Sequence, residues 1–163
     1  MQLFLRTIIT TALLSLTPIS TSYSQDNKEP LALLLSAKSI RCKIESGYST
    51  SFTEGKFKSD KDSFSSKEED KFLTFTNINI KEGTALSVGN AGSDKTLLTA
   101  TPAGLNFMSI TVSGGLVTAT ISPNLNKEGK FFYTTSRHTY INFGKPINVP
   151  SQYYGFCEIL ELQ

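Results

Sequence analysis

Residues 129–157, GKFFYTTSRHTYINFGKPINVPSQYYGFC, contain the features that decide the fold. Residues 130–143 are the longest strand-like run of the chain, and residues 152–160 predict a second strand. Two prolines and a glycine in residues 144–151 predict an irregular crossing between the two strands. The stretch also holds the only histidine, His138, and one of the two cysteines. A disulfide from the cysteine in this stretch would therefore place the last predicted strand beside the segment that contains the other cysteine.

The other cysteine, Cys42, lies in a segment of strict alternation. In residues 39–45, Ile40 and Ile44 fall on the same face as Cys42, which indicates a half-buried strand with the sulfur facing the interior. In an exported chain, two cysteines most simply form one disulfide, here Cys42 to Cys157, and two free, buried thiols are the alternative. Because this disulfide would close a long loop, it would stabilise the fold by about 4–5 kcal/mol.

Between the two cysteines, short apolar runs alternate with turns rich in Gly, Pro and Asn. The turns recur about every 8–12 residues, and no long helix is predicted. We expect strands at residues 51–58, 71–80, 84–88, 96–101, 105–112 and 115–122, and a solvated loop at residues 59–70. With the strands at the two ends, about eight or nine strands result, which predicts an all-β fold.

The disulfide favours one of two all-β architectures. It places the first strand beside the last, which is how an up-and-down barrel closes its open edge. We therefore expect a single antiparallel β-barrel, lipocalin-like or avidin-like in outline. A Greek-key β-sandwich is the alternative.

The N-terminal residues predict export. Residues 1–24 have a positive charge at Arg6, an apolar run, and small residues at Ser22 and Ser24, as in a secretory signal peptide. The apolar run is too short to span a membrane. Residues 25–37 form a polar leader and a short apolar lead-in, which is either one helical turn or the start of a strand. Residues 38–163 form a single β domain, located in the periplasm or outside the cell.

Composition argues against several classes of function. The formal net charge is only +2 over 163 residues, so nucleic acid has no electrostatic attraction for this chain. One histidine, two paired cysteines, and acidic residues interleaved with lysines predict no metal site, and no cofactor is expected. Residues 89–96 lack a glycine that a phosphate loop needs, and residues 111–115 lack the first glycine of a nucleophile elbow.

A polar cluster near the C-terminus is the candidate site. Arg137 shares a strand face with Phe131 and Tyr133, so its guanidinium is expected to point inward, where it either closes one end of the barrel or binds an acidic ligand. His138 has no acid nearby in the sequence, so no catalytic residue is assigned. The cluster, whether it binds a ligand or supports the fold, comprises Ser136, Arg137, His138, Gln152, Tyr153 and Tyr154.

The same residues carry a resemblance. Residues 136–138 (SRH), Pro146, Pro150 and residues 151–157 (SQYYGFC) resemble a C-terminal signature of small exported bacterial proteins of unknown function. The resemblance implies a disulfide-bonded β fold and a location in the cell envelope. It implies no known activity.

These observations support three hypotheses about function. The leading one is a non-enzymatic, monomeric barrel that binds a small apolar or amphipathic ligand, or an envelope protein. The second is a fully packed structural or interaction module that acts through its loops. The third is a hydrolase or isomerase that uses His138. A cavity would separate the first two, and an acid and a nucleophile beside His138 would favour the third.

Overall fold

The computed structural model describes residues 28–53, 55–62, 71–90, 92–111, 114–142 and 146–162. The predicted signal peptide and residues 25–27 of the predicted leader lie outside these residues. So does most of the predicted loop, at residues 63–70.

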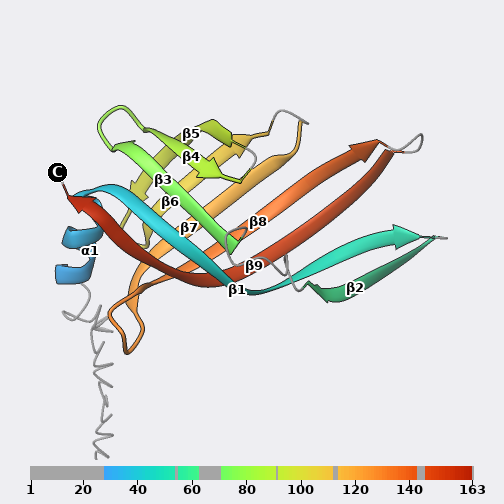
Figure 1. Ribbon diagram of the computed structural model, residues 1–163, viewed down its shortest axis with the longest axis horizontal. Helices are drawn as coiled ribbons and strands as arrows, with labels where there is room; N and C mark the ends of the chain where they lie inside the picture. The colour runs from blue at the N-terminus through green and yellow to red at the C-terminus, as the bar shows by residue number, and fades with distance from the viewer. Residues whose placement is uncertain are drawn as a thin grey trace, which may run out of the picture.

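One short helix and nine strands make up this part of the chain (Figure 1). Helix α1 spans Lys28–Leu35. The strands are β1 Ala37–Thr53, β2 Lys56–Asp62, β3 Phe72–Asn79, β4 Thr84–Gly89, β5 Gly92–Thr101, β6 Gly104–Ile110, β7 Leu116–Leu125, β8 Phe131–Asn142 and β9 Pro146–Leu162.

The strands form a closed antiparallel barrel. Each strand from β3 to β9 pairs with its successor, β9 pairs with β1, and β1 pairs with β3, so eight strands complete the circle. The second half of β1 pairs instead with β2, which forms an extra strand outside the circle (Figure 1). The predicted all-β barrel is therefore confirmed, and the sandwich alternative is not adopted.

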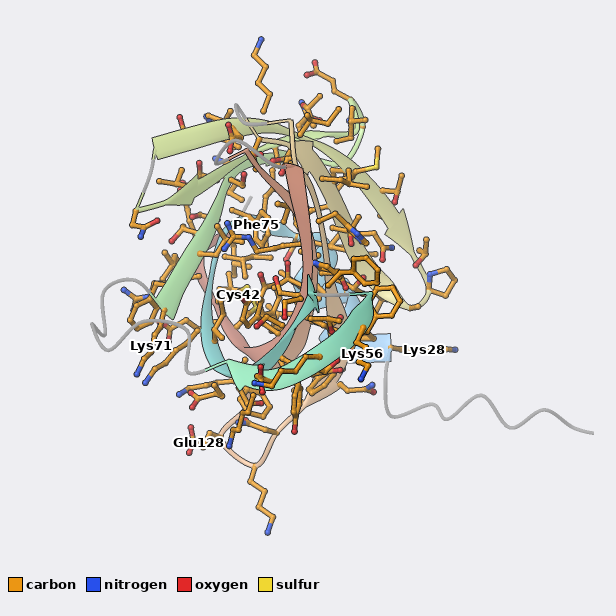
Figure 2. The ribbon with its side chains drawn as sticks, turned by 90° about the vertical axis from the view of Figure 1, so that its right-hand side faces the viewer. Lys28, Cys42, Lys56, Lys71, Phe75 and Glu128 are labelled. Carbon is orange, nitrogen blue, oxygen red and sulfur yellow. A yellow bond between two sulfur atoms is a disulfide. The ribbon has the colours of Figure 1, made fainter. Side chains whose placement is uncertain are left out.

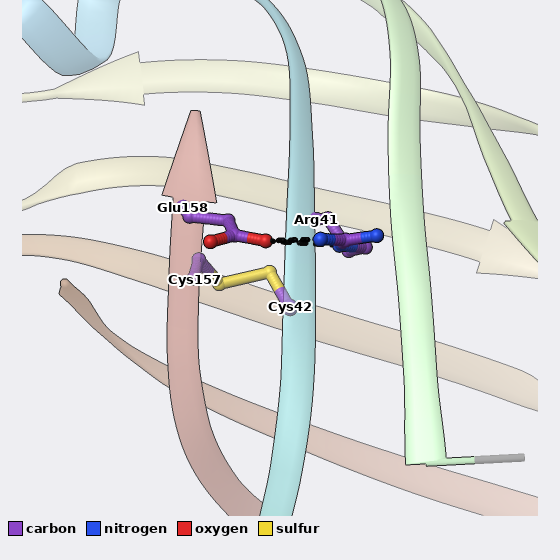
Figure 3. Close-up of a disulfide and its surroundings, with 4 residues drawn as sticks. All are labelled: Arg41, Cys42, Cys157 and Glu158. Carbon is purple, nitrogen blue, oxygen red and sulfur yellow. Dashed lines mark hydrogen bonds and ion pairs between the residues drawn. A yellow bond between two sulfur atoms is a disulfide. The ribbon is translucent and has the colours of Figure 1, made fainter. Parts of the chain in front are cut away.

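The seam between β1 and β9 carries the predicted disulfide. Cys42 and Cys157 lie directly opposite each other, their sulfurs are 2.01 Å apart, and both side chains are fully buried. On the outer face of the same seam, the Arg41 side chain donates to a Glu158 carboxylate oxygen, with its Nε 3.0 Å away (Figure 3). The disulfide therefore joins the first strand to the last from the inside of the barrel.

Gly155 lets the two backbones of this seam approach closely. A Cβ atom at this position would overlap the carbonyl oxygen of Lys43 on β1. The pairing of β1 with β9 also shifts its register here, between Ile44 and Ser46, as at a β-bulge. Glycine is thus required by the neighbouring backbone.

Helix α1 corresponds to the helical alternative predicted for the apolar lead-in, and it is longer than the single turn expected. Pro30 and Glu29 lie in its first turn, where a missing N–H and a negative charge are both favourable, and leucine and alanine continue it. Leu34 is fully buried in the core, and α1 lies against β6 and β7 at one end of the barrel (Figure 1). With eight residues, this helix is too short to cross a membrane.

The single strand predicted at residues 51–58 is wrong. A turn interrupts it, and Phe52 of β1 pairs with Phe57 of β2, with ring centroids 4.8 Å apart. The predicted loop is also a strand as far as Asp62. Every side chain of β2 described in the structure is exposed, including 78% of Phe57, so no buried face imposes the alternation that marks a strand.

The irregular crossing predicted at residues 144–151 is wrong as well. Strand β9 begins at Pro146 and pairs with β8 in continuous register through Pro150. Its pairing with β1 reaches only as far as Ser151, so both prolines lie where β9 has β8 as its one described neighbour. A proline without an N–H is tolerated at such an edge.

Candidate ligand-binding cavity

The barrel encloses a cavity of about 590 Å³. Its walls come from β1 and from β3 to β8, and it reaches the turn between β4 and β5 and the turn between β6 and β7. Helix α1 lies at the other end of the barrel (Figure 1). Figure 2 looks along the barrel toward α1, with Phe75 and Cys42 inside the ring of strands. One end of the barrel is thus covered by α1.

Aromatic side chains form the deepest part of the cavity. The rings of Phe75 and Phe107 are stacked, with centroids 3.9 Å apart and planes inclined by 18°, and both are buried. Ala119 lies opposite Phe107 on the neighbouring strand and leaves space above the rings because its side chain is small. The deep surface is therefore suited to an apolar group.

Hydroxyl groups line the wall but are largely occupied by the backbone. The hydroxyls of Ser87 and Thr96 both donate to the carbonyl oxygen of Asp94, at 3.4 Å and 3.2 Å. The Thr135 hydroxyl donates to the Thr118 carbonyl oxygen at 2.9 Å. Because these donors are already used, the wall offers a ligand fewer hydrogen bonds than its composition suggests.

Tyr133 is the exception. Its side chain is fully buried, and its hydroxyl has no hydrogen-bond partner among the described residues. Burial raises the pKa of Tyr133 far above its usual range, and the nearby Thr135 hydroxyl and Arg137 charge oppose this only in part. The Thr135 hydroxyl donates to the Thr118 carbonyl oxygen, so its proton is not available to Tyr133. Tyr133 therefore stays protonated, and its buried hydroxyl is left without a partner among the described residues.

Arg137 also lines the cavity, as its strand parity predicted. It is half-buried and lies two residues beyond Thr135 on the same face of β8, between Val117 of β7 and Ser151 of β9. Within the described part of the chain, no carboxylate lies within ion-pairing distance of its guanidinium. The positive charge of Arg137 is thus not neutralised by any carboxylate among the described residues.

The predicted polar cluster is divided between the two faces of the sheet. Ser136 and Gln152 lie opposite each other on the outer face, and Tyr154 follows the same parity. Tyr153 is buried and its ring lies against Gly47, where a Cβ atom would overlap it. Of the six predicted residues, only Arg137 and the exposed His138 line the cavity.

Several cavity residues were absent from the predicted site. Asp94, Thr96 and Ser109 line the cavity, and Tyr133 was considered only as a core residue. The inward positions of residues 94, 96 and 98 do alternate, but the pattern starts inside a stretch of turn residues. The unpartnered hydroxyl of Tyr133 depends on packing, for which the sequence carries no signal.

The strand partners of His138 are Leu116 and Pro150, and neither is an acid or a nucleophile. Among the described residues, no three His, Cys, Asp or Glu side chains are grouped so that they could hold a metal ion.

We expect Tyr133→Phe to raise the free energy of unfolding by about 1 kcal/mol. A buried hydroxyl without a partner loses its hydrogen bonds to water on folding, and phenylalanine keeps the ring without that cost. Urea denaturation of the wild type and the variant measures the difference. Buried Thr135→Val is the comparison, because it removes a hydroxyl that has a partner and should be destabilising. A less stable Tyr133→Phe variant would contradict this assignment.

No family model matches this sequence, and no curated protein matches it significantly. The case for function therefore depends on the cavity and its residues.

Proposed function

We propose that this protein is a ligand-binding barrel that holds a small, largely apolar molecule in its cavity. The observation that carries the proposal is the cavity itself, because about 590 Å³ is within the range of small-molecule sites. A barrel of this size could be filled entirely by side chains. The stacked rings of Phe75 and Phe107 give the space an apolar base.

The cavity also bears on the competing hypothesis of a packed module. A module that acts only through its loops gains nothing from internal space, and unfilled volume lowers stability. Small side chains at Ala119 and Ser109 leave room where larger ones would close the barrel. These features favour ligand binding over a purely structural role.

The proposed place of action is the periplasm or the exterior of a bacterial cell, with the protein as a monomer. The disulfide fits an oxidising compartment. The signal-like residues 1–24 and the C-terminal signature support the same location. In this setting, the barrel would carry or sequester its ligand outside the cytoplasm.

Binding of the neutral dye N-phenyl-1-naphthylamine tests the proposal. Its fluorescence rises in apolar surroundings, so titration should give a saturable signal with one dye per barrel. We expect Ser109→Phe to weaken binding by about tenfold, because the new ring fills the cavity from a position that is 8% exposed.

Met108→Phe is the matched control. It places the same ring one residue earlier, where the side chain is 42% exposed and faces away from the cavity. It should leave dye affinity within about twofold of the wild type. Circular dichroism would verify that both variants fold. Absence of saturable binding, or equal binding by both variants, would refute a ligand site in the cavity.

A further inference from the structure

We infer that the ligand is an amphipathic anion, whose negative group binds Arg137 while its apolar part occupies the base of the cavity. This inference rests on the proposed function, and it adds the chemical class of the ligand. It is carried by Arg137, which lines the cavity and has no carboxylate within ion-pairing distance among the described residues.

Arg137 supplies the charge. A guanidinium is permanently protonated and presents its donors in a planar fork that matches a carboxylate or sulfonate. An inward guanidinium normally needs a carboxylate, carbonyl oxygens or an aromatic face to compensate for lost hydration. Here no described carboxylate provides that compensation, so an anionic ligand would.

Arg137 lines the same cavity as the stacked rings of Phe75 and Phe107. An anionic group bound to Arg137 lies against the β8 wall, and the rest of the ligand meets the stacked rings.

A second charged residue of the cavity influences the orientation of the bound anion. Asp94 lines the opposite side on β5, three strands from β8 in an eight-stranded circle. Its carboxylate would repel an anion from that side and direct the negative group toward Arg137. His138 is exposed, and its side chain lies near the open end.

A pair of matched dyes tests the inference. 1-Anilinonaphthalene-8-sulfonate has the ring system of N-phenyl-1-naphthylamine and adds one negative group. We expect Arg137→Gln to weaken sulfonate binding by at least about tenfold and to leave the neutral dye within about twofold. Asp94→Asn should leave sulfonate binding equal or tighter.

Competition with simple lipids gives an independent readout. Decanoate should displace the bound sulfonate, whereas decan-1-ol at the same concentration should displace it much less. Arg137→Lys keeps the charge without the fork, so it should retain part of the preference for the anion and covers the case in which Arg137→Gln does not fold.

The outcomes separate the inference from the proposed function. If the wild type binds neither dye, the ligand-binding proposal itself fails. If the wild type binds both dyes but Arg137→Gln and Arg137→Lys bind the sulfonate as tightly as the wild type, the cavity binds ligands and the anion inference is overturned. Equal displacement by decanoate and decan-1-ol would overturn it too.

Discussion

Replacing both cysteines with alanine should lower the free energy of unfolding by about 4 kcal/mol. The disulfide joins Cys42 and Cys157, which are 115 residues apart, so its loss restores much conformational freedom to the unfolded chain. The loss also falls at the seam that closes the barrel, where β1 and β9 pair. Guanidinium denaturation of the oxidised wild type and the double variant measures the difference.

Two controls make the disulfide experiment specific. The reduced wild type should unfold near the denaturant midpoint of the double variant, because it lacks the same bond. Arg41→Ala removes the ion pair beside the disulfide, and since Arg41 and Glu158 are both exposed, it should cost less than about 1 kcal/mol. Equal midpoints for the oxidised wild type and the double variant would contradict the contribution assigned to the disulfide.

Gly155→Ala should destabilise the protein by about 3 kcal/mol, although it adds only one methyl group. That methyl would overlap the Lys43 carbonyl oxygen, which belongs to the backbone of β1 and cannot rotate away as a side chain could. The strands would have to separate at the seam, which weakens their hydrogen bonds. Thermal and urea unfolding of the variant give the loss directly.

Gly89→Ala is the matched comparison for Gly155→Ala. A Cβ atom there would lie 3.6 Å from a methyl carbon of Leu73, an ordinary van der Waals contact. Its stability should therefore stay within about 1 kcal/mol of the wild type. If the two glycine variants unfold at the same denaturant concentration, the close approach of β1 and β9 is not a constraint.

Sequence patterns predicted the strands that have one buried face and one solvent-exposed face. In β1, Ile40, Cys42 and Ile44 are buried as the alternation indicated, and in β7 Ala119 and Ile121 are buried. The pairing of the two cysteines then predicted closure of the barrel, because it identified which ends must meet. These two kinds of information were sufficient for the architecture.

Patterns failed where a strand has no buried face or only one neighbour. Strand β2 is exposed wherever its side chains are described, so its charged residues are typical of a loop as much as of a strand. The first residues of β9 contain prolines, which an edge tolerates and a central strand does not. In both places the partner strand, rather than the local sequence, determines the structure.

The candidate site was predicted in part. The alternation of side chains along β8 predicted that Arg137 lines the cavity. This alternation depends only on the local geometry of the strand. Grouping Arg137 with Ser136, Gln152 and Tyr154 reflected proximity in sequence, although neighbours in a strand face opposite ways. Asp94 reaches the same cavity from β5 only through the closure of the circle, which no local pattern encodes.

The pairing of the first strand with the last also constrains the order of folding. Most neighbours around the circle are joined by short turns, so their contacts can form soon after each segment is synthesised. Strand β1 must wait longest for one of its neighbours, since β9 is the strand farthest from it along the chain. Until then, one edge of β1 is an open template for other strands. Formation of the β1–β9 pair is therefore the step that covers this open edge.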